Sequence, residues 1–255
     1  FFKQKTAYEI STRDWSSDVC SSDLPNFKDA IYGVAKLVNG ESIFVMEFHW
    51  AYEILRGVHY DSIYHEHTYY HSIASVEKIL IEFGLIAFDA FESPISGGSV
   101  VLVASKQLRE PSANLMEMKH LEKNANLESN SVWRKFGTEA IENISFIRNK
   151  IDSFAGKKIC GFGASARSAT ILNAVGASAS YLVSIGDNNP NKWGKFSPGS
   201  GILIEPIEKM LGRNPDLIIL FPFNFKDEIL KQFLQLGWSG KVLLPVPHPP
   251  QLLKI

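Results

Sequence analysis

Three side chains that can hold or move a proton stand close together at Tyr64, Glu66 and His67. An imidazole titrates near neutral pH, and a neighbouring carboxylate can fix which ring nitrogen carries the proton. This combination favours general acid–base catalysis, with His67 as the base and Glu66 as the residue that orients it. A set of histidines satisfied inside the fold is the alternative interpretation.

The same segment does not have the spacing of a zinc site. A His-Glu-x-x-His motif needs its second histidine four residues after the first, and Tyr69 stands four residues after His65. His67 and His71 have that spacing, but the sequence near them offers no clear third metal ligand. The sequence therefore predicts no metal site here.

A second candidate site is the stretch Gly161-Phe162-Gly163-Ala164-Ser165-Ala166, which matches Gly-x-Gly-x-x-Gly/Ala between an expected strand and an expected helix. Gly161 permits a tight turn, and Gly163 lets a phosphate approach the backbone. The helix N-terminus, which begins near Ser165, offers N–H groups to that phosphate. The motif predicts a nucleotide-like ligand without separating NAD from a nucleotide sugar, and strand–helix packing without a ligand is the alternative.

Two further residues are placed to complete this second site. Arg167 lies in the first turn of the expected helix, from which its guanidinium can reach a phosphate. Asp187 ends the next expected strand, roughly where an acid that binds a ribose is expected. Both are predicted ligand-binding residues.

The elements that must position these residues fall into two α/β series separated by a charged, helical connector at 107–150. Residues 25–106 are expected to hold helices at 27–38, 51–57 and 72–83, and strands at 42–48, 85–93 and 99–105. The last two strands are expected to form an antiparallel pair at a sheet edge. Residues 151–255 alternate strands with helices, which argues for a parallel sheet with covered faces and a last strand at 241–247.

Composition narrows the class of protein. The first 24 residues carry three basic and four acidic side chains, which account for the net charge of −1, so the rest of the chain is neutral and gives no support for nucleic-acid binding. No apolar run approaches the length of a membrane span. Beyond the first 24 residues Cys160 stands alone, which fits a reducing cytoplasm.

The first 24 residues are unlike the rest. They lack the apolar run of a secretory signal and carry too many acids for a transit peptide. Residues 3–10 and 14–24 back-translate into two constant strings resembling a sequencing-library adapter, with 11–13 on its variable barcode. We therefore expect residues 1–24 to be translated adapter fused to a broken gene; a genuine polar tail is the alternative.

Beyond these motifs, the chain resembles the sugar C-methyltransferases, which are S-adenosylmethionine-dependent enzymes that act on nucleotide-linked keto-sugars. The stretch from Tyr60 to Ser105 resembles the later part of their cofactor domain, including a Tyr-x-Glu-His segment at Tyr64–His67 and a Gly-Gly-Ser hairpin at Gly97 and Gly98. Four later stretches resemble the family's second Rossmann-like domain, in the expected order: GFGASARSATILNAVG, DNNPNKWGKFSPGSGI, PDLIILFPFNF and GWSGKVLLPVP.

The resemblance implies an α/β fold: the C-terminal half of a class I methyltransferase domain, a helical connector and a second Rossmann-like domain. It implies that His67 removes a proton beside the keto group, that Tyr64 hydrogen-bonds the developing oxyanion, and that the enolate attacks the methyl group of S-adenosylmethionine. Glu66 would orient the base or bind sugar. Residues Gly161 to Arg167, with Asp187 and Lys192, would hold the nucleotide sugar, and Gly97 and Gly98 would line the substrate site.

The family usually also has a Cys-rich zinc domain and an acidic, glycine-rich cofactor loop, and neither pattern occurs in this sequence. We therefore expect a fragment of a longer enzyme that binds the methyl donor weakly or not at all and holds no cofactor tightly. Two other functions stay open from the sequence. One is an NAD-dependent oxidoreductase built on the Gly161 turn, and the other is a non-catalytic nucleotide-sugar-binding module.

Overall fold

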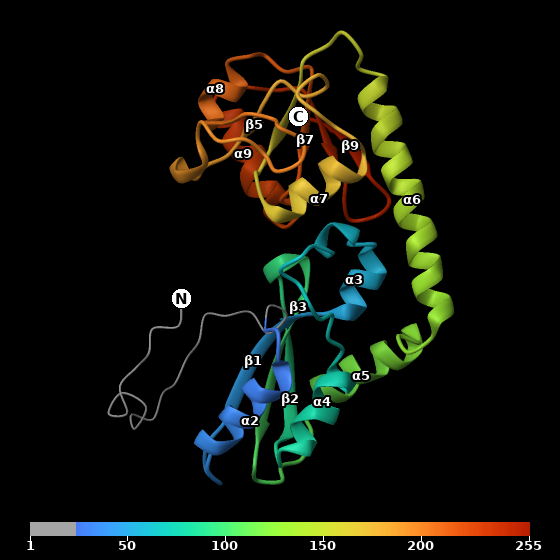
Figure 1. Cartoon of the computed structure of the whole chain (residues 1–255), viewed down its shortest axis with the longest axis vertical. Coiled ribbons are helices and arrows are strands. Elements are labelled where there is room, and N and C mark those ends of the chain that lie inside the picture. Colours follow the sequence, from blue (N-terminus) through green and yellow to red (C-terminus); the bar gives the residue numbers. More distant parts are fainter. Residues whose placement is uncertain (1–23) are drawn as a thin grey trace.

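The structure, a computed structural model, describes residues 24–255. The adapter hypothesis for residues 1–24 therefore falls almost wholly outside the described residues and stays a prediction. The described chain forms a three-stranded domain and a six-stranded domain, with a long helix running beside the second (Figure 1). The expected α/β class with two sheets is confirmed.

The first domain is an antiparallel sheet of order β1-β3-β2 with helices on it. Its elements are α2 (Phe27–Leu37), β1 (Phe44–His49), α3 (Ala51–Gly57), η2 (Tyr60–Ser62), α4 (Ile73–Glu82), β2 (Ile86–Ser93), η3 (Ile95–Gly97) and β3 (Ser99–Ser105). The predicted pairing of β2 with β3 is confirmed, but β3 is the central strand because β1 pairs with its other side. Only β2 of the predicted pair lies at the sheet edge.

Local chemistry explains why α4 begins and ends where it does. The Ser72 hydroxyl oxygen accepts a hydrogen bond from the Ser75 backbone N–H, and the Ser75 hydroxyl oxygen accepts one from the Ser72 N–H, which satisfies two donors at the helix start. Gly84 ends the helix with φ +73, a conformation that only glycine adopts at little cost. Ile73, Val76 and Leu80 then face the sheet as one buried stripe.

The connector consists of two helices that belong to different domains. In α5 (Ala113–Ala125), Leu115 and Met118 pack into the core of the first domain. In α6 (Asn130–Asp152), Ile147 and Ile151 pack into the core of the second domain, and the helix continues two residues past the predicted limit of 150. Thus α5 extends the first domain, whereas α6 extends the second and also contacts Tyr60 of the first.

The second domain has a six-stranded sheet of order β6-β5-β4-β7-β8-β9, parallel except for β9. Its elements are β4 (Ile159–Phe162), α7 (Ala166–Ala174), β5 (Ile185–Gly186), η4 (Pro190–Lys192), β6 (Ile204–Glu205), α8 (Ile207–Leu211), β7 (Leu217–Leu220), η5 (Phe223–Phe225), α9 (Lys226–Gln235), β8 (Lys241–Leu244) and β9 (Gln251–Lys254). The prediction that β8 would be the last strand is wrong, because β9 adds an antiparallel edge beside it.

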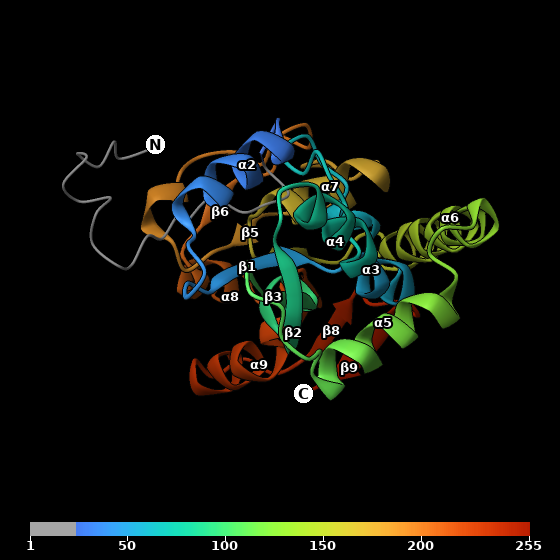
Figure 2. The same ribbon diagram turned by 90° about the horizontal axis from the view of Figure 1, so that it is seen from below.

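Viewed from below, α2 and α4 lie over one side of the first sheet, and α5 approaches it near β2 (Figure 2). A buried carboxylate, Glu122 of α5, fixes that approach. It accepts hydrogen bonds from Trp50 Nε1 at 2.6 Å and from the backbone N–H groups of Ile73 at 2.6 Å and Ala74 at 3.1 Å. Burial raises the pKa of Glu122, and these hydrogen bonds partly offset the rise.

Replacing Glu122 by Ala is expected to lower the free energy of unfolding by about 3 kcal/mol or more, because two buried donors and one half-buried donor lose their acceptor. Glu122→Gln should cost less, since the amide oxygen still accepts. The matched control is Glu128→Ala, which removes an exposed partner of Lys78 and should change stability by less than about 0.5 kcal/mol. Urea unfolding measures all three, and an E122A value within 1 kcal/mol of the wild type would contradict the assignment.

Candidate active site

Both ring nitrogens of His67 make hydrogen bonds within the turn that follows η2. Its Nδ1 lies 3.0 Å from the backbone carbonyl oxygen of Ser62, and its Nε2 lies 2.7 Å from the hydroxyl of Tyr64. A carbonyl oxygen only accepts, so Nδ1 carries the proton and Nε2 presents its lone pair to the tyrosine O–H. The ring is thereby fixed in the tautomer that can act as a base through Nε2.

The hydrogen bonds of the His67 ring go to groups other than the Glu66 carboxylate. Glu66 is exposed, and the described residues give it no hydrogen bond or ion pair with His67. Ser62 and Tyr64 contact the two ring nitrogens, and an orienting role for Glu66 stays a prediction. A sugar-binding role for Glu66 stays a prediction.

Two buried histidines that the sequence motifs did not single out lie beside His67. The ring of His49, at the end of β1, is 6.3 Å from the His67 ring and 6.2 Å from the His59 ring. Burial, helped by the charge of Arg167, lowers the pKa of His49 to about 3. Burial lowers the pKa of His59 to about 4, although the Asp61 carboxylate opposes the shift. Both rings are therefore neutral at physiological pH.

Around these rings lies a cluster of buried polar atoms without a hydrogen-bond partner among the described residues. The members of this polar cluster are Nδ1 and Nε2 of His49, Nδ1 of His59, Oδ1 of Asp61, Oγ of Ser62 and Nη2 of Arg167. Buried polar groups are normally paired, and exceptions of this kind gather at sites that handle ligands. The cluster contains both donors and acceptors.

Arg167 belongs to this cluster although it comes from α7 of the second domain. Its Nε donates to Asp61 Oδ2 at 2.6 Å, its Nη1 donates to the backbone oxygen of Ser96 at 2.7 Å, and its guanidinium lies 5.2 Å from the centre of the Phe223 ring. The Asp61 side chain is completely buried. The arginine that was expected to reach a phosphate is instead engaged at the junction between the two domains.

The glycines of the second candidate site are required by packing. A Cβ on Gly163, whose φ is +91, would come 2.6 Å from Pro222, and a Cβ on Gly161 would come 2.9 Å from Phe221. Both contacts come from the segment that follows β7. This close approach explains the two glycines, and an approach by a phosphate stays a prediction.

Asp187 and Lys192 both lie at the Gly161–Ala166 turn, where their side chains hydrogen-bond to its backbone. Asp187 Oδ2 accepts from the Ala164 N–H at 2.7 Å, and Asp187 Oδ1 accepts from the Asn189 N–H at 2.8 Å. Lys192 Nζ donates to the Ala164 carbonyl oxygen at 2.7 Å and to Asp187 at 3.2 Å. Both carboxylate oxygens are thus engaged, which weakens the main sequence argument for a ribose-binding acid and an NAD site.

Ser165 is the N-cap residue of α7, and its own backbone N–H is already hydrogen-bonded. Its backbone N–H bonds to Ser168 Oγ at 2.8 Å, and its side chain accepts from the Ser168 N–H at 3.2 Å. The backbone N–H groups of Ala166 and Arg167 lack an intrahelical acceptor, because they lie in the first turn. These two donors are the part of the turn best suited to an anion.

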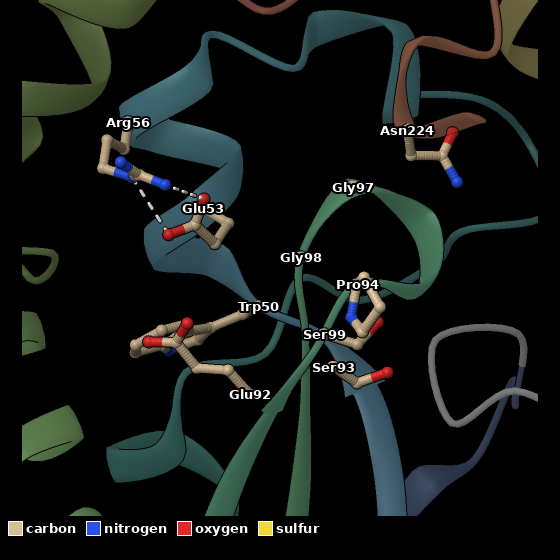
Figure 3. Close-up of a pocket in the computed structure, with 10 residues that line it drawn as sticks. All are labelled: Trp50, Glu53, Arg56, Glu92, Ser93, Pro94, Gly97, Gly98, Ser99 and Asn224. Carbon is tan, nitrogen blue, oxygen red and sulfur yellow. Dashed lines mark hydrogen bonds and ion pairs between the residues drawn. The ribbon is translucent and has the colours of Figure 1, made fainter. Parts of the chain in front are cut away.

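Gly97 and Gly98 line a pocket of about 410 Å³ between α3, the β2–β3 hairpin and Asn224 of the second domain (Figure 3). The residues that line it are Trp50, Glu53, Arg56, Glu92, Ser93, Pro94, Gly97, Gly98, Ser99 and Asn224. Glu53 and Arg56 form an ion pair in its wall. Tyr64 and His67 do not line it, so the two glycines and the candidate base face different spaces.

His49 and Asp61 had only weak signals in the sequence. His49 ends a strand, and ligands of open α/β sheets collect at the carboxyl ends of strands. Asp61 precedes the Tyr64–His67 segment by three residues, but nothing in its spacing indicates that its partner would be Arg167.

Among the described residues, no cluster of three or more His, Cys, Asp or Glu side chains is placed to hold a metal ion. No described helix has the length and apolarity needed to cross a membrane.

These features define a two-domain α/β protein with a candidate base where the domains meet. The family model described as "C-methyltransferase C-terminal domain" matches residues 94–247, which is more than half of the chain. The C-methyltransferase NovU of Streptomyces niveus is 27% identical over 260 residues, covering 97% of this chain and 61% of that protein. The chain thus spans about three fifths of the length of this curated relative. The chain belongs to the family with the C-methyltransferase C-terminal domain, which confirms the expected resemblance.

The lowered pKa values of His49 and His59 predict a stability that falls in acid. The unfolded chain takes up these protons near pH 6.5, whereas the folded chain does so only near pH 4 and 3. Stability is therefore fully present above pH 6.5 and is lost as the pH falls toward 4, by up to about 1.4 kcal/mol per pH unit for each histidine. Urea unfolding at pH 7.5, 6.0 and 5.0 measures the slope.

The variant His49→Gln should reduce this slope between pH 6.0 and 5.0 by about one proton, because glutamine does not titrate. His65→Gln, at an exposed histidine of the neighbouring segment, is the matched control and should leave the slope unchanged. Equal slopes for H49Q and the wild type would contradict the burial of a neutral imidazole at position 49.

Proposed function

We propose that this chain carries the proton-abstracting base and the sugar-binding domain of an S-adenosylmethionine-dependent C-methyltransferase that acts on a nucleotide-linked keto-sugar. The hydrogen bonding of His67 carries the proposal. With Nδ1 tied to the Ser62 carbonyl, Nε2 is the nitrogen that would accept a proton from carbon once a substrate replaces the Tyr64 hydroxyl beside it. Membership in the C-methyltransferase family supports the reaction class.

The chemistry asked of His67 is the removal of one proton. The Nε2 lone pair takes a proton from the carbon next to the keto group, the C–H electrons form the new carbon–carbon double bond, and the carbonyl electrons move onto oxygen. The product is an enolate, whose carbon is a nucleophile, and a protonated His67.

Tyr64 has two successive partners in this step. In the present arrangement its hydroxyl donates to Nε2 at 2.7 Å. A substrate C–H must take that place before the proton can move. The released hydroxyl is then free to donate to the enolate oxygen, which stabilises charge where it develops.

The second domain is proposed to hold the nucleotide part of the substrate. The Ala166 and Arg167 N–H groups at the start of α7 are suited to a diphosphate, and Lys192 adds positive charge at the same turn. The methyl donor is not assigned to residues of this chain. In the glycine turn that follows β4, the N–H groups of Ala164 and Ser165 are already bonded to Asp187 and Ser168.

Proton abstraction can be tested without the methyl donor. The full chain is incubated with a nucleoside diphosphate keto-sugar in D₂O, and loss of the proton signal beside the keto group is followed by NMR. The wild type should exchange this proton above the buffer rate. His67→Gln should reduce the excess rate by about 100-fold or more, because the base is lost.

His65→Gln is the matched control, since it removes an exposed histidine two residues away and should keep the wild-type rate. Exchange that persists in H67Q would refute His67 as the base. A chain that binds the nucleotide sugar by calorimetry but gives no exchange would be a binding module rather than an enzyme. NADH binding tighter than that of the nucleotide sugar would favour the oxidoreductase.

A further inference from the structure

The segment that precedes the candidate base is fastened to the second domain. The backbone N–H of His248 donates to the Gly57 carbonyl oxygen at 3.0 Å. The Tyr60 hydroxyl donates to Asn143 Oδ1 at 3.1 Å, and Asn143 Nδ2 donates in turn to the Pro245 carbonyl oxygen at 2.9 Å. Tyr60 and Asn143 are both buried, so these contacts are shielded from water.

The strongest of these attachments is the ion pair between Arg167 and Asp61. Asp61 is directly followed by Ser62, whose carbonyl oxygen accepts a hydrogen bond from His67 Nδ1. A continuous run of contacts therefore leads from α7 of the second domain to the imidazole on the first. A second arm of Arg167 holds the Ser96 carbonyl oxygen in η3, so the guanidinium clamps two segments of the first domain at once.

Arg167 is better placed to join Asp61 and Ser96 than to bind a phosphate. Nε and Nη1 are already used, Nη2 is buried, and the charge is neutralised by a carboxylate at 2.6 Å. The planar fork of arginine suits this arrangement, because it reaches a carboxylate and a carbonyl from one rigid group.

We propose that Arg167 and Asp61 are positioning residues for His67, so that the second domain sets the geometry of the base carried by the first. This inference rests on the proposed role of His67. Because α7 begins at the turn assigned to the nucleotide, binding of the nucleotide sugar and orientation of the base are mechanically connected through Arg167. Neither residue needs to touch the substrate for this role.

The first test does not require catalysis. In ¹⁵N-histidine-labelled full chain, the tautomer of His67 and its hydrogen-bonded Nδ1 proton are observed by NMR and assigned with H67Q. Arg167→Gln should abolish the protected Nδ1–H signal or mix the tautomers. The matched control is Arg213→Gln, which breaks an arginine–carboxylate pair of the same length, 2.6 Å to Glu205, inside the second domain. It should leave the His67 signal unchanged.

An unchanged His67 signal in folded R167Q would overturn the proposal. Arg167→Lys covers the case in which R167Q does not fold, because the ammonium keeps the charge but cannot serve Asp61 and Ser96 together; the same two outcomes apply to it. The neutral pair Asp61→Asn with Arg167→Gln should not restore the signal, which separates positioning from relief of an unpaired charge.

The second test uses the proton-exchange assay. In R167Q the kcat for exchange should fall about 10-fold or more while KM for the nucleotide sugar changes less than about threefold. A rise in KM at unchanged kcat would instead make Arg167 a phosphate ligand and refute the positioning role. If the wild type shows no exchange at all, the proposed function fails, and the NMR experiment still decides whether Arg167 orients His67.

Discussion

The completely buried carboxylate of Asp61 is the constraint that ties the two domains together. An unpaired charge in such a place is very costly, so Asp61 needs a partner, and that partner is Arg167 from the other sheet. The pair sits within an apolar seam, in which Ile54 and Val58 join the core of the second domain. The domains therefore cannot part without exposing apolar surface and separating the ion pair.

The two candidate sites differ in how they satisfy their own polar groups. The Gly161 turn is closed by its own residues, since Asp187 and Ser168 take up the N–H groups of Ala164 and Ser165. The junction beside His67 is the opposite, because its polar cluster contains buried atoms without a partner among the described residues. The glycine motif thus satisfies much of its own backbone, whereas the geometry around the candidate base depends on residues brought together by the domain interface.

The sequence correctly predicted features that depend on neighbouring residues, such as the ends of helices. Ser72 and Gly84 mark the ends of a helix because capping and a positive φ depend on neighbours within a few residues. Prediction from the sequence was wrong where contacts between distant residues determine the structure. The segment Gln251–Lys254 forms β9 by pairing with β8, and the contact of the His67 ring with the Ser62 carbonyl oxygen was not anticipated. The Asp61–Arg167 pair spans 106 residues, so no window of the sequence reveals it.

The polar cluster implies a trade between stability and function. A buried donor or acceptor that lacks a partner costs roughly 1–3 kcal/mol, and apolar side chains of similar size would remove that cost. Hydroxyl groups of a sugar ring can pair with such atoms, because each offers both a donor and an acceptor. Under the proposed function, the cost of these buried atoms in the folded chain would be offset where a bound sugar supplies the missing partners.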